Sequence, residues 1–205
     1  MTVMIEMDGQ QMPARAGASI LEAAKAAGIH IPTLCHLPGR ACKPVCRLCS
    51  VAIAGWSNLH PACATPLQDG MVITTQGPQI ERMRRTLMSL VLEEHGACAI
   101  PDCNIEQLAQ QLGVPIVAHS LPAKEAHSEA HPAITSNYIL FDSSQCIHCD
   151  RCIRACERTI LTRSGRGASV SMVFGNNQSI DASGCIACGD CLAVCPSGAL
   201  AKYNE

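Results

Sequence analysis

The sequence is short of aromatic residues, of charge and of long apolar runs. Its 205 residues include two Tyr, two Phe and one Trp, and the formal net charge is −2. Nucleic-acid binding favours basic surfaces and aromatic stacking platforms, so this composition argues against a nucleic-acid partner. No apolar run approaches the length of a membrane span, and we expect any membrane association to come through partner proteins.

Catalytic signatures are missing as well. The sequence has no GxGxxG phosphate loop, no candidate flavin site and no hydrolytic constellation. Its start, MTVMIEMDGQ, lacks the basic and apolar regions of a signal peptide, which favours a cytoplasmic location. We therefore expect a chain without catalytic residues of its own, one that ends at Glu205 before any catalytic domain.

Cysteine, by contrast, is abundant, with 15 residues. Disulfide scaffolds of that density are short secreted chains, so metal ligation in a reducing compartment is the better interpretation. Because aromatics are scarce, the core must consist mainly of Ala, Val, Ile, Leu and Met. We expect bound metal to supply part of the folding free energy and the metal-free chain to be poorly ordered.

One cysteine pattern, CxxCxxCxxxC, occurs twice near the end of the chain. It reads CIHCDRCIRAC at 146–156 and CIACGDCLAVCP at 185–196. This is the bacterial ferredoxin run, in which three thiolates bind one [4Fe–4S] cluster and the fourth binds the other cluster. Zinc is the alternative, but structural zinc uses four thiolates in pairs, not two runs of four with Pro196 after the last.

The exchange of the fourth ligand divides eight cysteines between two clusters. The first cluster is predicted to bind Cys146, Cys149, Cys152 and Cys195. The second cluster is predicted to bind Cys185, Cys188, Cys191 and Cys156. Together they make residues 138–205 a predicted 2[4Fe–4S] ferredoxin domain.

Residues 1–77 form the first predicted domain. Asp8-Gly9 favours a tight hairpin turn, and Ser19 is expected to cap a helix that ends at Gly28. Four short strands are expected, at 3–7, 11–14, 51–54 and 71–75. This order of strands, helix and further strands resembles the β-grasp ferredoxin fold, so the whole chain is expected to be of the α+β class.

Four cysteines of this domain have the spacing Cx10CxxCx13C, and they are Cys35, Cys46, Cys49 and Cys63. Three ligands on a loop and a fourth beyond a strand indicate a plant-type [2Fe–2S] site, although the plant spacing has a shorter first gap. Isolated cysteines are often plain buried thiols, yet four in register favour ligation. Cys42 lies outside the spacing. We expect it to pack near the cluster without binding iron, a ligand role being the alternative.

These motifs resemble one family of iron–sulfur modules. The similar stretches are IPTLC at 31–35, CRLCSV at 46–51 and PACATPLQDGM at 61–71. The family includes the N-terminal module of the large iron–sulfur subunit of respiratory NADH dehydrogenase and of some iron-only hydrogenases and formate dehydrogenases. It also includes the small diaphorase subunit of NAD-reducing hydrogenases.

Residues 78–114 are predicted to be a helical connecting segment. Its first helix is expected over 78–94, with an apolar stripe formed by Ile80, Met83, Leu87, Leu90 and Val91. Four charged residues are expected largely off that stripe, namely Arg82, Arg84, Arg85 and Glu93.

The family resemblance implies a further [4Fe–4S] site in this segment, held by one His and three Cys. Here only His95, Cys98 and Cys103 are available, and the loop is shortened, although CNIEQLAQQLGV matches the closing helix. A cluster would need a fourth ligand from solvent, a substrate or a neighbouring chain. We therefore expect this cluster to be lost and the two cysteines to be packing remnants.

Residues 115–137 are predicted to be a linker of Pro, Ser and Ala. Its histidines, His119, His127 and His131, match no zinc spacing and are expected to be solvated, a metal site being the alternative. Between the two cysteine runs, residues 160–180 resemble the family's inserted hairpin, including Gly-Arg-Gly at 165–167.

The expected function is electron relay, because a cluster is a one-electron site and several in one chain form a path. The resemblance implies a non-catalytic electron-transfer subunit of an NAD(H)-linked complex, with one [2Fe–2S] and two [4Fe–4S] clusters. A flavin-bearing diaphorase would be one partner, and a hydrogenase, formate dehydrogenase or similar redox subunit the other. The alternatives are a free-standing polyferredoxin and a structural or sensory iron–sulfur module.

Overall fold

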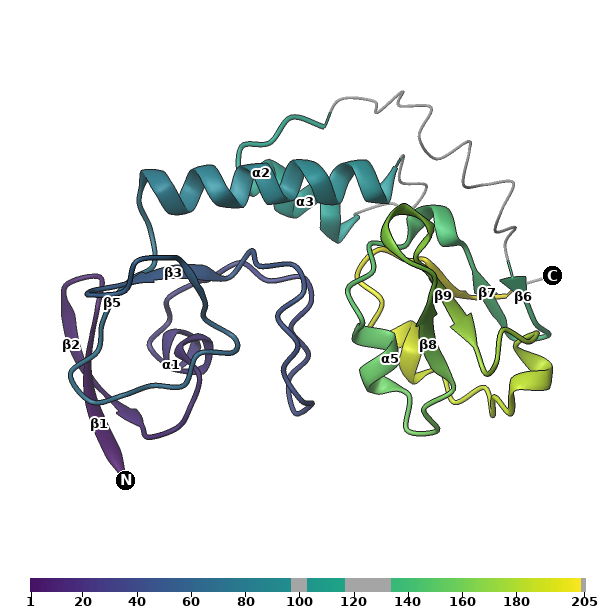
Figure 1. Ribbon diagram of the computed structural model, residues 1–205, viewed down its shortest axis with the longest axis horizontal. Coiled ribbons are helices and arrows are strands. Elements are labelled where there is room, and N and C mark those ends of the chain that lie inside the picture. The colour runs from purple at the N-terminus through teal and green to yellow at the C-terminus, as the bar shows by residue number, and fades with distance from the viewer. Residues whose placement is uncertain (97–102, 117–133, 204–205) are drawn as a thin grey trace. The chain divides into compact units, whose positions relative to one another are not determined.

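The computed structural model describes residues 1–96, 103–116 and 134–203 (Figure 1). The chain divides into two compact units. The first comprises Met1–His36, Cys42–Ser89 and Leu112–Val114. The second comprises Leu37–Ala41, Leu90–Gln111 and Pro115–Glu205.

The first unit is built on a five-stranded sheet of order β2-β1-β5-β3-β4. The strands are β1 (Thr2–Met7), β2 (Gln10–Arg15), β3 (Ser50–Ile53), β4 (His60–Pro61) and β5 (Val72–Thr74). β1 runs parallel to β5, and the other neighbours are antiparallel. The four strands expected from the sequence are confirmed within a residue or two, and the short β4 is additional.

The β1–β2 hairpin turns at Asp8-Gly9, as its sequence predicts. Both residues have positive φ, 49° and 82°, which is the conformation of a tight two-residue hairpin turn. The Asp8 carboxylate also accepts hydrogen bonds from the backbone N–H, at 2.7 Å, and the hydroxyl of Thr75. The turn residue therefore joins the end of β1 to the end of β5.

Helix α1 (Ile20–Ala26) begins at a capping box. The Ser19 hydroxyl accepts from the Glu22 N–H at 3.2 Å, and the Glu22 carboxylate accepts from the Ser19 N–H at 2.7 Å. The hydrogen bonds that the Ser19 N–H and hydroxyl donate to the Glu22 carboxylate lower the pKa of Glu22. The helix ends where Gly28 takes a φ of 74°, so both expected ends of the helix are confirmed.

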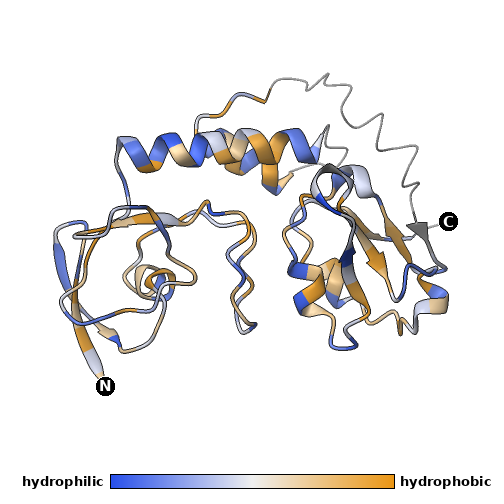
Figure 2. Cartoon of the chain, viewed as in Figure 1, coloured by the Kyte–Doolittle hydropathy of each residue, from blue (hydrophilic) through white to orange (hydrophobic). Residues whose placement is uncertain are grey.

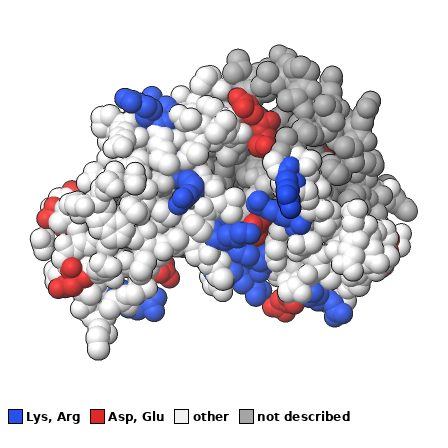
Figure 3. Space-filling model, viewed as in Figure 1, with Lys and Arg blue, Asp and Glu red and all other residues white. Residues whose placement is uncertain are grey.

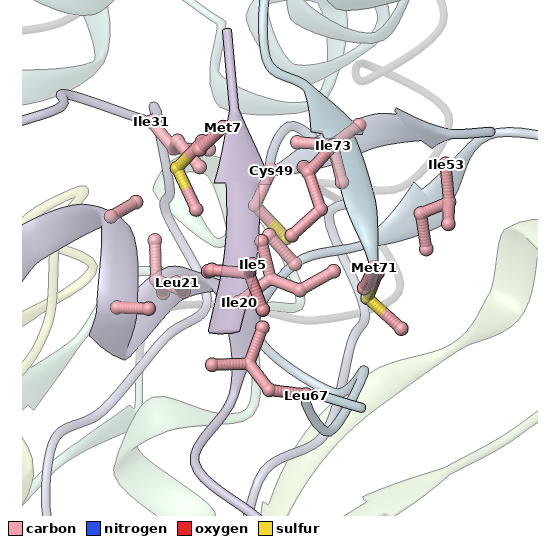
Figure 4. Packing of buried hydrophobic residues seen from close by; sticks show 14 of the residues in the cluster. Ile5, Met7, Ile20, Leu21, Ile31, Cys49, Ile53, Leu67, Met71 and Ile73 are labelled. Atoms are coloured by element: carbon pink, nitrogen blue, oxygen red, sulfur yellow. The ribbon is translucent and has the colours of Figure 1, made fainter. Parts of the chain in front are cut away.

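The core of the first unit lies between α1 and the sheet. Alternate β1 residues Ile5 and Met7 pack with Ile20 and Leu21 of α1 and with Ile73 of β5 (Figure 4). Apart from cysteine, this cluster consists of aliphatic residues and methionine, as the shortage of aromatics predicts. Figure 4 also shows Cys49 among these side chains, so a candidate metal ligand is anchored in the core.

Helix α2 (Pro78–His95) is confirmed, but its buried face differs from the expected stripe. Four buried residues follow steps of four, namely Ile80, Arg84, Met88 and Leu92, and His95 at the end of the helix is buried as well. Leu90, expected on the buried face, is 53% exposed, whereas Arg84, expected off it, is 6% exposed. The expected stripe was therefore right for Ile80, partly right for the half-buried Met83, Leu87 and Val91, and wrong for Leu90. The mixed colouring of α2 is visible in Figure 2.

Helix α3 (Asn104–Gln111) follows as the sequence predicts, and it buries Ile105, Leu108 and Ala109. The rest of the second unit has two small sheets. One has the order β10-β7-β6 and the other is the β8–β9 hairpin. Their strands are β6 (Ile134–Thr135), β7 (Ile139–Phe141), β8 (Leu161–Ser164), β9 (Ser171–Phe174) and β10 (Leu200–Lys202).

Short helices connect these strands. They are α5 (Arg151–Ala155), α6 (Asp190–Ala193) and the 3-10 turns η2 (Ser143–Gln145), η3 (Gly167–Ser169) and η4 (Asp181–Ser183). The sequence pattern did not indicate β6, which starts at Ile134 inside the expected linker. Phe141 and Phe174 pack edge to face in the core of this unit, with their ring centroids 6.1 Å apart.

The hairpin expected at 160–180 is confirmed, and its turn requires glycine. Gly165 has a φ of 86°, and a Cβ built on it would lie 2.2 Å from the Ser169 carbonyl oxygen. Any other residue would clash with backbone there. The Gly-Arg-Gly element is thus explained by turn geometry.

The visible surface carries few charges. Figure 3 shows acidic and basic side chains scattered over a face that is mostly uncharged, consistent with a charged fraction of 16%. Among the described residues, no helix is long and apolar enough to span a membrane.

Candidate metal centres

The four cysteines predicted to hold a [2Fe–2S] cluster lie in the first unit. The loop before β3 carries Cys46 and Cys49, and Arg47 between them has a left-handed φ of 60° that curls the loop. The Sγ atoms of Cys49 and Cys63 are 3.4 Å apart. The Cys46 N–H points at the Cys35 Sγ, 3.5 Å away. The chain therefore brings all four together in two sulfur pairs.

Within each pair, one thiol stabilises the thiolate of the other. The hydrogen bond with Cys35 lowers the pKa of Cys46 to about 6, and the hydrogen bond with Cys63 lowers the pKa of Cys49 to about 7. The same two hydrogen bonds, with burial, raise the pKa of Cys35 and of Cys63. Each pair thus contains one thiol that loses its proton more readily than its partner, and the thiolate is the form that binds iron.

Cys42 is exposed, and its thiol interacts with that of Cys63. This interaction raises the pKa of Cys63 after the larger effects of Cys49 and burial. Cys42 therefore lies near the predicted site, and its exclusion from iron binding stays a prediction.

The first predicted [4Fe–4S] set lines a cavity in the second unit. The cavity wall contains Cys146, Cys149, Cys152 and Cys195 together with apolar side chains such as Ile153, Met172 and Leu200. Burial is the main cause that raises the pKa of Cys152, and the next largest effects come from Cys149, Cys146 and Cys195. Four thiols from the two cysteine runs thus face one enclosed space, which suits a cube that binds one thiolate per iron.

The second predicted set groups in the same way. The pKa of Cys191 is raised to about 11, chiefly by burial and to a smaller extent by the charges of Cys185, Cys188 and Cys156. The neighbours of Cys191 thus come from its own run and from Cys156, the residue that follows α5. Cys188 and the nearby Ile186 are exposed, whereas Cys191 is buried, so the second set has one ligand at the surface of the unit.

The two cysteine loops share one backbone conformation. His148 and Asp150 in the first loop have φ of 52° and 62°, and the equivalent Ala187 and Gly189 have 53° and 85°. Left-handed residues at matched places turn both loops around their own cysteines. The sequence repeat is therefore also a structural repeat.

An ion pair between Asp150 and Arg163 stabilises the first cysteine loop. Asp150 is buried, and its carboxylate accepts from the Arg163 Nε of β8 at 2.5 Å. The Arg163 guanidinium also donates to the His148 carbonyl. Neither residue was singled out from the sequence, because nothing in the spacing of Asp150 and Arg163 signals that β8 folds against the loop.

The shortened His/Cys site brings two of its three residues together. His95, at the end of α2, is fully buried, and its Nε2 lies 3.1 Å from the Cys103 Sγ. Its Nδ1 lies 3.3 Å from the Gln145 carbonyl oxygen, which accepts if Nδ1 carries the proton. Cys98 and the linker histidines, His119, His127 and His131, lie outside the described residues.

In the described part of the chain, no three His, Cys, Asp or Glu side chains are close enough to surround a single metal ion. A cluster differs from a single ion in this respect, because its four thiolates are shared among two or four irons and so do not converge on one point. The cysteine sets described above are thus compatible with clusters.

Comparison with known proteins identifies two iron–sulfur domains in the chain. Residues 1–78 match a 2Fe-2S iron-sulfur cluster binding domain, and residues 145–199 match a 4Fe-4S dicluster domain. The chain is therefore an iron–sulfur protein of mixed α/β structure, with an N-terminal 2Fe-2S domain and a C-terminal 4Fe-4S dicluster domain.

The relatives include components of NAD(P)-linked enzymes. The chain is 32% identical to the NADP-reducing hydrogenase subunit HndD of Solidesulfovibrio fructosivorans, covering 97% of this chain and 36% of the relative. It is 31% identical over 160 residues to the mitochondrial NADH-ubiquinone oxidoreductase 78 kDa subunit of Candida albicans, covering 74% and 22%. It is 27% identical to the gamma subunit of NAD-reducing hydrogenase HoxS of Cupriavidus necator, covering 82% and 73%.

A solved structure extends the likeness to three dimensions. A chain in the crystal structure of an NAD+-reducing [NiFe]-hydrogenase matches with a TM-score of 0.83 and 27% identity, covering 98% of this chain and 87% of that one. The resemblance expected from the sequence is thereby confirmed. The chain nevertheless spans only about a fifth to a third of the length of the hydrogenase subunit HndD and the 78 kDa subunit.

Proposed function

We propose that this chain is the iron–sulfur electron-transfer subunit of a multisubunit, NAD(H)-linked oxidoreductase. The observation that carries the proposal is the combination, in one chain, of a 2Fe-2S domain and a 4Fe-4S dicluster domain that together match a chain of an NAD+-reducing hydrogenase. When bound, the clusters would each take up and release one electron.

The cysteine sets suggest where each cluster would be held. In this proposal Cys35, Cys46, Cys49 and Cys63 hold one [2Fe–2S] cluster within a β-grasp domain. The second unit holds two [4Fe–4S] clusters. One is bound by Cys146, Cys149, Cys152 and Cys195. The other is bound by Cys185, Cys188, Cys191 and Cys156. The site at His95 is proposed to carry no cluster, because His95, Cys98 and Cys103 give at most three ligands where a cube needs four.

The exposure of the second cysteine run suggests where electrons leave or enter the dicluster domain. Ile186, between Cys185 and Cys188, is 61% exposed, and Cys188 is exposed as well. An apolar side chain beside a surface-lying ligand set suits contact with a second redox subunit. That subunit is proposed to be a hydrogenase, formate dehydrogenase or similar enzyme, and a flavin-bearing diaphorase would serve the other end.

The same ligand sets would also suit a free-standing polyferredoxin, which shuttles between enzymes instead of residing in one. A cytoplasmic location fits both, because a reducing compartment keeps cysteine ligands unpaired. The two functions differ in whether the chain stays bound to a flavoprotein.

The test is anaerobic purification of the tagged full chain from its native cells, followed by addition of NADH and EPR spectroscopy. The proposal expects a stable complex containing flavin, in which NADH reduces the clusters. The isolated chain is the control, since it has no nucleotide fingerprint and should respond to dithionite alone. A monodisperse monomer without flavin, reduced by dithionite but never by NADH at any stage of purification, would favour the polyferredoxin.

A further inference from the structure

Arg84 stands out among the arginines of α2 because it is buried. It is 6% exposed, whereas Arg82 and Arg85, on the same helix, are exposed. Burying a guanidinium is costly unless its N–H groups and its charge are compensated. Its surroundings should therefore contain acceptors and a negative partner.

The acceptors are the carbonyls on either side of a cluster ligand. The Arg84 Nε donates to the Leu48 carbonyl oxygen at 3.0 Å, and Nη2 donates to the Ser50 carbonyl oxygen at 3.2 Å. Cys49 lies between these two residues. The Arg84 guanidinium thus holds the backbone around Cys49, at the start of β3, by two hydrogen bonds.

Cys49, between the two carbonyls that Arg84 contacts, is also the acidic group that most favours the charged form of Arg84. Desolvation lowers the pKa of Arg84, and the largest opposing effect is the charge on Cys49, ahead of Glu81 and Asp8. Within the described part of the chain, Arg84 forms no salt bridge with a carboxylate, unlike Arg85, which pairs with Glu81 at 3.3 Å. The buried cation therefore lies beside a cysteine that the proposed function assigns to iron.

We propose that Arg84 is a positioning residue of the N-terminal metal centre, which holds the Cys49 loop by two carbonyls and sets a fixed positive charge beside the cluster. The inference rests on the proposed [2Fe–2S] site. Reduction adds negative charge to the centre, and a nearby buried cation favours the reduced state. Arg84 should thus raise the reduction potential, which a purely structural clamp would not do.

The experiment compares full-length, cluster-loaded Arg84→Lys, Arg84→Gln and Arg84→Met with Arg82→Gln in an EPR-monitored redox titration of the [2Fe–2S] signal. Loss of the charge in the Gln and Met variants should disfavour reduction on the order of tenfold, equivalent to about 59 mV for one electron. The Lys variant keeps the charge and should stay near the parent potential, and Arg82→Gln should match the parent.

Two results would overturn the inference. One is a parent-like potential in both Gln and Met variants, and the other is an equal shift in Lys and Gln, which would assign the effect to lost geometry. If the Met variant fails to bind the cluster, the Gln and Lys pair, whose side chains both still donate hydrogen bonds, decides the question. Absence of any [2Fe–2S] signal from the parent chain would instead contradict the proposed function.

Discussion

At the scale of single residues, the fourth cysteine of each run decides which four ligands each [4Fe–4S] cluster has. Cys195 lines the cavity of the first set, and Cys156 is among the neighbours of Cys191 in the second. Each cluster would thus depend on a residue that lies far away in the sequence. Loss of the fourth cysteine of one run should therefore damage the cluster whose three other ligands belong to the other run.

Cys156→Ala therefore should impair the cluster that Cys185, Cys188 and Cys191 hold, and leave the one held by Cys146, Cys149 and Cys152. The physical reason is that a cube with three thiolates loses an iron readily. EPR and Mössbauer spectra of the reduced variant would show which signal changes. Cys195→Ala is the matched control and should do the reverse. Loss of the Cys146 signal alone in Cys156→Ala would disprove the crossed assignment.

At the scale of secondary structure, α2 is the element whose orientation needed the structure. Met88 is fully buried and Leu90, two residues on, is 53% exposed. Truncation of a buried Met removes packing and leaves a cavity, whereas truncation of an exposed side chain does little. The two positions therefore test which face of α2 is packed.

Met88→Ala should lower the free energy of unfolding by about 2–5 kcal/mol, and Leu90→Ala should change it by less than about 0.5 kcal/mol. Chemical denaturation of the cluster-loaded chain, followed by circular dichroism, measures both. Equal losses in the two variants would mean that Leu90 is also covered, as the apolar stripe in the sequence suggested.

The same element shows what sequence patterns could and could not supply. Local signals placed β1, β2 and α1 well, because a turn dipeptide, a capping box and a terminal glycine act on their immediate neighbours. The burial of Arg84 was missed because its acceptors, Leu48 and Ser50, are more than 30 residues away in the sequence. The spacing of the cysteines predicted the ligand sets, but no sequence pattern indicated the ion pair between Asp150 and Arg163.

At the scale of the whole molecule, the question is how many clusters the chain carries. His95 and Cys103 are both buried, and the His95 Nε2 lies 3.1 Å from the Cys103 Sγ. Two ligands are too few for a cube, and the third candidate, Cys98, lies outside the described residues. The total iron content therefore distinguishes a chain with three clusters from one that also keeps the family's further [4Fe–4S] cluster.

Anaerobic iron and acid-labile sulfide analysis of the purified chain should give roughly ten irons per chain, from one [2Fe–2S] and two [4Fe–4S] clusters. Roughly fourteen would mean that His95 and Cys103 recruit further ligands into a fourth cluster. Cys103→Ala is the matched variant. It should leave the iron content at the parent value, because the thiol serves packing and one hydrogen bond to His95. A loss of about four irons in this variant would show that the site holds a cluster after all, and that the relay has one more step.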